Sequence, residues 1–223
     1  MDVAIAGAHG QIARRLTRRL VARGDTVRGM IRDPAHVDDV RADGADPVLC
    51  DLERALVTDV ALAVEGADAV LFAAGAGPGS GGERKGRMDR DGALLLLEAA
   101  RSARVPEYVM VSAMGADDPP EGDDVFSVYL RAKADADRAL MDSDLAWTVV
   151  RPGLLTDDPG TGRVRIARRL PHGEVTRDDV ATVLEAVLHD HRIAHRVLSV
   201  VGGEASIADA LDGFVAADPR DGG

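Results

Sequence analysis

The sequence predicts an α/β protein in which a doubly wound parallel sheet carries helices on both faces and a small lobe follows at the C-terminal end. Three observations predict this fold class. Six short apolar segments alternate with helical patterns between residues 3 and 150, with short connections. The first of them, 3–6, breaks into glycine and continues as a helical pattern. The segment 69–74 is purely apolar, which is typical of a strand covered on both faces.

Each expected element is set by its apolar spacing and by the residues that end it. The helix over 11–23 places Ile12, Leu16 and Leu20 on one side and arginines on the other, and Gly24 ends it. The sheet strands are expected at 3–6, 26–31, 46–51, 69–74, 108–112 and 146–150. The further helices are expected at 37–42, from about 54 to 64, at 94–103 and at 129–141, with a glycine-rich loop over 75–86.

The periodicity loosens after Pro152, and this change predicts the C-terminal lobe. A turn-rich loop is expected over 157–162, followed by a strand at 164–167, a helix at 178–188, a strand at 196–201 and a last helix at 207–214. Residues 1–218 are therefore expected to form one domain whose substrate lobe is made mainly after residue 152. Residues 219–223 are expected to be a frayed tail.

Composition argues against several classes of protein. Hydrophobic residues make up 46% of the 223, which is ample for a core, but aromatic residues are only 3%, so the stacking platforms of single-strand binders are nearly absent. The formal net charge of -11 repels phosphate polymers and anionic lipid surfaces. Cys50 is the only cysteine, and no segment resembles a signal peptide or a membrane span. We expect a cytoplasmic protein without a disulfide, a metal site, or a nucleic-acid or membrane partner.

The turn after the first strand has the pattern G-x-x-G-x-x-A. Gly7 lets the chain leave the strand sharply, Gly10 lets the backbone approach a pyrophosphate, and Ala13 is small enough for the helix to pack against the strand. The unpaired amides and the positive dipole end of the helix would then face the phosphates. The pattern predicts a dinucleotide site with His9 near the phosphates. A glycine-rich turn that binds no ligand is the alternative.

The residues after the second and third strands favour NADP over NAD. Arg32 follows the second strand, where a dinucleotide fold places the adenosine ribose, and an arginine suits a 2'-phosphate whereas an acid suits free ribose hydroxyls. Asp33, one residue further on, could serve as the acid that favours NAD, although Pro34 after it indicates a turn. Asp51 with Leu52 is expected to meet the adenine, with a helix cap as the alternative role for Asp51.

A tyrosine and a lysine four residues apart indicate proton chemistry. Tyr129 and Lys133 would share one face of a helix, so that the ammonium lowers the pKa of the phenol and lets it donate a proton near neutral pH. Lys85 and Lys133 are the only lysines among 27 basic residues, which favours a role for a compact ammonium at this place. Ser112 ends the fifth strand on the same edge and could hold a carbonyl oxygen. A buried tyrosine beside a surface lysine, and an ordinary strand-end hydroxyl, are the alternatives.

Together these motifs resemble the short-chain dehydrogenase/reductase superfamily, most closely its atypical branch of NAD(P)-dependent epimerases/dehydratases and NAD(P)H-binding proteins. The resemblance covers nearly the full chain and implies a Rossmann-type sheet. It rests on 7–13, Arg32, 51–52, 73–75, 111–113, Tyr129 with Lys133, 150–153 and 176–181. The cofactor-binding residues it implies are Gly7, His9, Gly10, Gln11, Ile12, Arg32, Asp51, Leu52, Ala73, Ala74, Gly75, Lys133, Pro152 and Gly153.

The same resemblance implies a catalytic group of Ser112, Tyr129 and Lys133. Lys133 would also hold the nicotinamide ribose, and the pair 152–153 would lie near the nicotinamide ring. Better-known relatives have an asparagine as the fourth member, and Asp89 stands at that position here. Its carboxylate could order a water or hold Lys133, but it offers no amide donor.

The expected function is NADP-dependent oxidation or reduction of a small carbonyl or hydroxyl compound, with Tyr129 handling the proton. One alternative is an epimerase or dehydratase that uses the cofactor transiently. Another is a non-catalytic protein that senses the NADP redox state and signals through a partner. Tyr129 with Lys133 favours an enzyme, whereas Asp89 and the small lobe favour the sensor. We expect a monomer or a homodimer with a small-molecule substrate.

Overall fold

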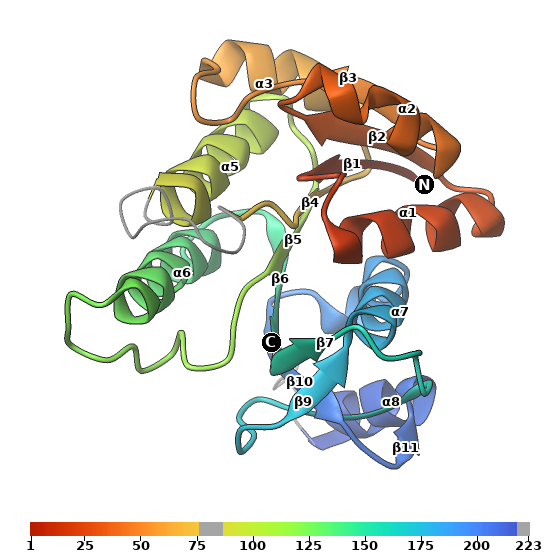
Figure 1. Cartoon of the computed structure of the whole chain (residues 1–223), viewed down its shortest axis with the longest axis vertical. Coiled ribbons are helices and arrows are strands. Elements are labelled where there is room, and N and C mark those ends of the chain that lie inside the picture. Colours follow the sequence, from red (N-terminus) through yellow and green to blue (C-terminus); the bar gives the residue numbers. More distant parts are fainter. Residues whose placement is uncertain (76–86, 218–223) are drawn as a thin grey trace.

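The computed structural model describes residues 1–75 and 87–217 (Figure 1). The strands are β1 Asp2–Ala6, β2 Thr26–Ile31, β3 Asp46–Leu49, β4 Ala69–Phe72, β5 Glu107–Val111, β6 Ala146–Pro152, β7 Leu154–Thr156, β8 Arg163–Ala167, β9 Glu174–Thr176, β10 Arg196–Gly202 and β11 Ala205–Ser206. The α-helices are α1 Gln11–Arg23, α2 Val37–Ala42, α3 Val57–Val64, α5 Ala93–Ser102, α6 Val125–Met141, α7 Arg177–Leu188 and α8 Ile207–Ala217. Shorter helical segments are η1 Pro34–His36, η2 Arg87–Gly92 and η3 His191–Ile193. The predicted glycine-rich loop beyond Gly75 and the predicted tail lie outside the described residues.

The central sheet confirms the predicted doubly wound topology. Within the described ranges it has nine strands in the order β11-β8-β10-β6-β5-β4-β1-β2-β3. The strands from β3 across to β10 are parallel, whereas β8 pairs antiparallel with β10 and with β11. The chain runs outward from β1 to β3 and then returns to build the other half from β4. The strand order therefore reverses between β1 and β4, and ligands of such sheets bind at the carboxyl ends of the strands there.

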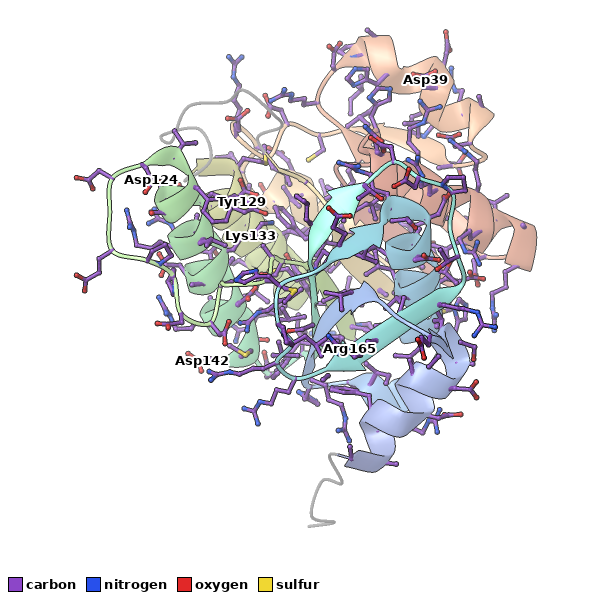
Figure 2. The ribbon with its side chains drawn as sticks, turned by 60° about the horizontal axis from the view of Figure 1, so that its bottom comes forward. Asp39, Asp124, Tyr129, Lys133, Asp142 and Arg165 are labelled. Carbon is purple, nitrogen blue, oxygen red and sulfur yellow. The ribbon has the colours of Figure 1, made fainter. Side chains whose placement is uncertain are left out.

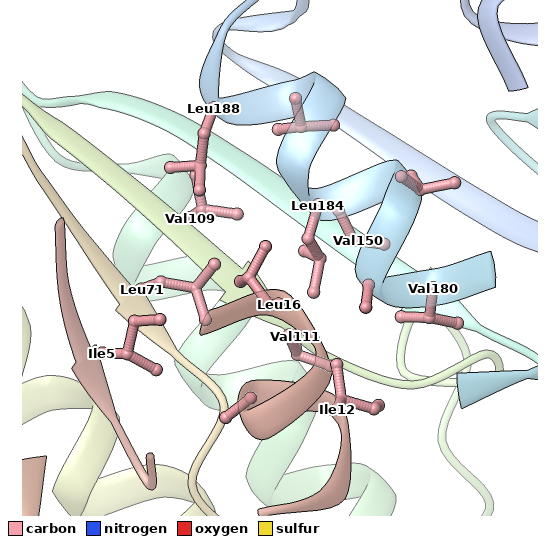
Figure 3. Close-up of a cluster of buried hydrophobic side chains, with 14 of the residues drawn as sticks. Ile5, Ile12, Leu16, Leu71, Val109, Val111, Val150, Val180, Leu184 and Leu188 are labelled. Atoms are coloured by element: carbon pink, nitrogen blue, oxygen red, sulfur yellow. The ribbon is translucent and has the colours of Figure 1, made fainter. Parts of the chain in front are cut away.

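Helices cover both faces of the sheet. On one face α1 and α7 lie side by side, and on the other α3, α5 and α6 form the second layer (Figure 1). Leu16 of α1, Leu184 of α7 and Leu71 of β4 are fully buried in the first layer (Figure 3). Burying each of these side chains contributes about 1.5 to 3 kcal/mol. This layer fixes α1, and with it the position of the glycine turn.

The helix that carries the tyrosine and lysine begins earlier than predicted. It starts at Val125 rather than Tyr129, because the carboxylate of Asp124 accepts hydrogen bonds from the amides of Phe126 and Ser127 at 3.0 and 3.1 Å. An N-terminal cap of this kind satisfies amides that the helix cannot pair. Tyr129 therefore lies in the second turn of α6, with one helical turn before it and the rest of the helix after it.

Three short strands of the C-terminal part were not predicted. β7 and β9 pair with each other in a two-stranded parallel sheet, and β11 pairs with β8. The amide of Leu154 donates to the carbonyl of Gly173 at 2.9 Å, which joins the segment after β6 to the start of β9. A turn-rich loop does separate β7 from β8, as the sequence predicts over 157–162.

Glu107 is a buried acid at the first position of β5, and it gives a prediction about stability. Its side chain is buried, and no ion pair or hydrogen bond reaches it from the described part of the chain. Burial raises the pKa of its carboxyl from an ordinary 4.5 to about 7. Between these two values the folded state holds a proton that the unfolded state has released, so stability falls as pH rises through this window.

We therefore expect Glu107→Gln to be more stable than wild type at pH 8, by up to about 3 kcal/mol, because a neutral amide avoids the buried charge. At pH 5 the difference should be small, because the folded wild type is then protonated. Urea unfolding of both proteins at the two pH values measures this, and comparing the pair cancels the other titrations. A stability difference that does not change between pH 5 and pH 8 would contradict the expectation.

Candidate functional site

A cavity of about 240 Å³ lies at the switch point, between the carboxyl ends of β1, β2 and β4. Nine of the predicted cofactor residues come together in its wall. Its lining residues are Gly7, His9, Gly10, Met30, Ile31, Arg32, His36, Cys50, Asp51, Leu52, Ala73, Ala74, Gly75 and Met88. The cavity thus joins the glycine turn to the ends of the second, third and fourth strands, as a dinucleotide site requires.

The glycine turn has the close approach that the sequence predicts. Gly7 has φ +81°, and a Cβ there would lie 2.6 Å from the Cα of Ala74, so only glycine fits. Gly10 precedes α1 and has no side chain to cap the helix, whose first turn also lacks an acid. The amides of the first turn are therefore available to an anion. Gln11 and Ile12 offer those amides, but their side chains do not line the cavity, and Ile12 is buried in the core.

Arg32 stands at the predicted ribose end of the cavity, half-exposed and paired with Glu53 at 2.9 Å. Beside it His9 and His36 stack with ring centroids 3.6 Å apart, and His9 Nε2 lies 2.7 Å from Asp39 Oδ2. His36 was not predicted. The sequence did carry a signal for its position, because an Asp before a Pro is a typical helix start. Asp33 accepts a hydrogen bond from the amide of Ala35, and the short helix that begins there places His36 in the cavity wall.

The segment after β3 differs from its prediction. The strand ends at Leu49, two residues before the predicted end, and Cys50 after it is half-buried and lines the cavity. Burial raises the pKa of the Cys50 thiol, so it stays protonated at neutral pH. The Asp51 carboxylate accepts a hydrogen bond from the amide of Glu53 at 3.1 Å, so it both caps a turn and lines the cavity.

Lys133 is the centre of a second, adjacent group of residues. Its side chain is 4% exposed, and Nζ donates to the carbonyl of Val111 at 3.0 Å and pairs with Asp89 Oδ1 at 3.1 Å. Nζ also lies 5.9 Å from the ring centre of Tyr129, one helical turn away on the inner side of α6 (Figure 2). Burial lowers the pKa of Lys133, but Asp89 together with Tyr129 more than offsets it, so the net shift is upward. The ammonium is therefore held charged inside the protein.

Asp89 stands in η2, directly before α5, as the fourth member of this group. Its side chain is buried, and Oδ2 has no hydrogen-bond partner within residues 1–75 and 87–217. A Cβ on Gly75, which lines the cavity, would lie 3.3 Å from Oδ1 of Asp89. A buried acceptor without a donor is completed by a water or by a ligand hydroxyl. The carboxylate holds Lys133, which is one of the two roles that the sequence suggests for it.

The pKa of Tyr129 shifts in the direction opposite to the prediction. Burial of this largely buried phenol raises its pKa by more than Lys133 lowers it, and Asp89 and Asp137 raise the pKa further. The sequence showed the positive charge but not the two carboxylates that surround it. The phenol therefore carries its proton at neutral pH.

Ser112 does not point to an empty space beside Tyr129. Its hydroxyl donates to Asp137 Oδ2 at 2.9 Å, and Nε of Arg151 donates to the same oxygen at 2.9 Å. All three side chains are buried. Burial raises the pKa of Asp137, against the effect of Arg151. Asp137 follows Lys133 by four residues on α6, so this spacing could have indicated a buried polar line along the helix.

The predicted pair at the end of β6 has a clear structural role. Pro152 is the last residue of the strand, and the amide of Gly153 donates to the carbonyl of Val200 at 2.9 Å. A Cβ on Gly153 would lie 2.1 Å from the carbonyl oxygen of Gly173, so this position requires glycine. Neither residue lines the cavity at the switch point.

Other site types find no support among the described residues. These contain no cluster of three or more His, Cys, Asp or Glu side chains arranged to hold a metal ion. None of the helices in 1–75 and 87–217 combines the length and the apolar character that crossing a bilayer requires.

A Rossmann-type sheet with this glycine-turn cavity, and with a Tyr-Lys pair on the helix beside it, defines an atypical short-chain dehydrogenase/reductase. The sequence model of the family described as "NAD(P)H-binding" matches residues 7–191. The chain belongs to this family of NAD(P)H-binding proteins.

Three relatives show how far the likeness extends. The chain is 36% identical over 212 residues to the uncharacterized sugar epimerase YhfK of Bacillus subtilis, which covers 95% of this chain and 99% of the relative. It is 33% identical over 214 residues to the UPF0659 protein YMR090W of Saccharomyces cerevisiae, over 91% of this chain and 94% of the relative. A solved structure from Bacillus halodurans, named as an NAD-dependent epimerase/dehydratase, superposes with a TM-score of 0.90 at 32% identity, covering 96% of this chain and 100% of that one.

Proposed function

We propose that this chain is an NADP-dependent oxidoreductase that acts on a small carbonyl or hydroxyl compound, with Tyr129 moving the proton. The observation that carries the proposal is the setting of Lys133. A lysine is rare in this chain, and this one is buried, charged, fixed by Asp89 and the carbonyl of Val111, and placed near the ring of Tyr129. Burying an ammonium costs several kcal/mol, so a purely structural role is better served by an apolar side chain.

The cavity at the switch point fits the cofactor. NADP, when bound, supplies or accepts the hydride. The first-turn amides of α1 would hold the pyrophosphate, and the small wall formed by Ala73, Ala74 and Gly75 leaves room for the cofactor to pass toward Lys133. Lys133 and the unpaired Oδ2 of Asp89 would bind ribose hydroxyls, one as a donor and the other as an acceptor.

Tyr129 is the residue that would exchange a proton with the substrate oxygen. Its phenol carries the proton at neutral pH, so it is ready to donate in the direction of reduction. Lys133 stabilises the phenolate that remains after donation. Ser112 would assist only after releasing Asp137, so in this proposal it supports the site from behind rather than holding the substrate.

An epimerase or dehydratase is the second candidate, and the names of the relatives from Bacillus subtilis and Bacillus halodurans favour it. The same residues would serve it, because such enzymes remove a hydride and return it. The two candidates differ in net cofactor use. A reductase consumes NADPH in step with product, whereas an epimerase converts its substrate without net consumption.

The choice of NADP over NAD gives a prediction at Arg32. We expect NADPH to bind at least tenfold more tightly than NADH, and Arg32→Ala to remove most of this preference. A charge-assisted contact from a guanidinium to the 2'-phosphate is worth about 1.5 to 3 kcal/mol. Binding would break the exposed ion pair between Arg32 and Glu53, but such a pair contributes little, so most of this free energy remains. Calorimetric titration of both cofactors into both proteins measures the effect.

Arg54→Ala is the matched control for this titration. Arg54 is exposed, lies 3.8 Å from Asp51 and does not line the cavity, so its loss should leave the preference unchanged. Equal affinities of the wild type for NADPH and NADH would overturn the assignment to NADP. A preference that survives in Arg32→Ala would move the 2'-phosphate to other residues, with His9 and His36 the nearest.

A further inference from the structure

A second cavity, of about 230 Å³, is lined by residues of α6, of β6 and of the segment after β8. Four arginines line it, in a chain whose net charge is -11. Its lining residues are Ala116, Asp117, Ala134, Arg138, Met141, Arg151, Arg168, Arg169 and Val197, none of which lines the cavity at the switch point. We refer to it as the arginine cavity.

Two of these arginines, one buried and one exposed, share the carboxylate of Asp117. Arg151 is buried and bonded to Asp137, and its Nη1 lies 3.7 Å from Asp117. Arg169 Nε pairs with the other oxygen of Asp117 at 2.9 Å. Asp117 is the one carboxylate that lines the cavity within the described part of the chain, and it is shared between two guanidinium groups. The buried Arg151 is therefore positioned before any ligand arrives, which reduces the ordering cost of binding, whereas the exposed pair of Arg169 orders its side chain little.

The other two arginines leave positive charge for a ligand. Arg138 pairs with Asp135, an exposed contact that contributes little. The guanidinium of Arg168 has no ion pair or hydrogen bond among the described residues. The backbone carbonyl of Arg168 accepts a hydrogen bond from the hydroxyl of Ser199. Three carboxylates, Asp117, Asp135 and Asp137, thus pair with the other three arginines, and the guanidinium of Arg168 adds positive potential to this concave site.

We propose that the arginine cavity binds a compact oxyanion of the phosphate class, either free phosphate or the phosphate group of a larger molecule. Guanidinium groups match the spacing of phosphate oxygens and donate two hydrogen bonds from one plane. The site is lined by residues from the segment after β5 and from the segment after β8. An anion held between Arg151, which lies on β6, and Arg168 would therefore link β6 to the segment after β8. Through Arg151 and Asp137 the bound anion is also connected to Ser112.

The test is calorimetric titration of inorganic phosphate into the full chain, with sodium chloride at equal ionic strength as the reference. We expect saturable phosphate binding that weakens at least tenfold in Arg168→Gln, the loss expected for one charge-assisted contact. Arg165→Gln is the matched control, because Arg165 is also exposed, lies on β8 three residues earlier and does not line this cavity (Figure 2). Arg32→Gln should bind phosphate as the wild type does.

The remaining outcomes either overturn the proposal or distinguish free phosphate from the phosphate group of a larger molecule. Absence of saturable binding, or binding unchanged in Arg168→Gln, removes the site. Equal loss in Arg165→Gln indicates diffuse surface charge instead, and loss in Arg32→Gln places the phosphate in the cavity at the switch point. Titration of glycerol 3-phosphate distinguishes the sources: tighter binding than inorganic phosphate supports a larger phosphorylated ligand, whereas equal or weaker binding supports the free ion.

Discussion

Tyr129→Phe is expected to lower turnover on the order of a hundredfold or more while cofactor affinity and stability change little. The substitution removes only the hydroxyl, and the ring keeps its packing beside Phe126, 6.2 Å away between centroids. General acid catalysis by one side chain is worth about 10² to 10⁴ in rate, and no other phenol is near, because Tyr108 is buried and donates to the carbonyl of Ala93. A screen of carbonyl compounds and nucleotide sugars for NADPH oxidation supplies the substrate for this measurement.

Lys133→Arg is the companion variant, and it should weaken both turnover and cofactor binding. A guanidinium is wider than an ammonium and cannot take the same position between Asp89 and the carbonyl of Val111. A cofactor sensor would respond differently: Tyr129→Phe would be silent, and Lys133→Arg would reduce binding alone. Tight NADPH binding without any Tyr129-dependent turnover would therefore replace the enzyme with the sensor. Conversion of a nucleotide sugar without net NADPH consumption would select the epimerase.

The raised pKa of Tyr129 bears on the proposed proton transfer. A phenol with a raised pKa keeps its proton at neutral pH but is a weaker acid than free tyrosine. The proposed donation to a substrate oxygen therefore depends on the ammonium of Lys133, 5.9 Å from the ring centre, to stabilise the phenolate that forms.

The elements with local signals were predicted closely, and those without were missed. Helix α1 has the predicted bounds, because glycines flank it and its apolar spacing is regular. Helix α6 begins four residues early, because Asp124 supplies a cap in a stretch that reads as an acidic loop. Strands β7 and β9 have three residues each and exist because they pair with each other across the intervening strand β8 and its loops, which periodicity cannot reveal.

The candidate site shows the same difference between residues with a local signal in the sequence and contacts without one. Residues predicted from glycine geometry and strand ends, such as Gly7, Arg32 and Ala74, do line one cavity. In the second group the sequence suggests that Asp89 could hold Lys133, as found, but it does not predict the contacts of Asp137, because they join distant segments. Asp137 accepts from the hydroxyl of Ser112, and the role of this one charged residue among several on α6 is visible only once its partner on β6 is known.

Asp89→Leu is expected to destabilise the protein by about 3 to 5 kcal/mol, the second large effect. Among the described residues the substitution would leave the buried Lys133 ammonium with the carbonyl of Val111 as its hydrogen-bond acceptor and no counter-ion bonded to it, and an uncompensated buried charge is costly. Asp89→Asn should lose less, because the amide oxygen still accepts from Nζ although its charge is gone. Urea unfolding at neutral pH measures both.

The double variant Asp89→Leu with Lys133→Met tests whether stability depends on the ion pair itself or only on filling the space that the two side chains occupy. Replacing both ions by apolar groups of similar size is often neutral or stabilising, so we expect the double variant to regain most of the stability that Asp89→Leu loses. It should remain inactive and bind cofactor weakly, because the ammonium near Tyr129 is gone. Recovered stability without recovered function would show that the ion pair is kept for chemistry. A double variant no more stable than Asp89→Leu would instead make the pair a structural requirement of the fold, and would remove the observation on which the proposed function depends.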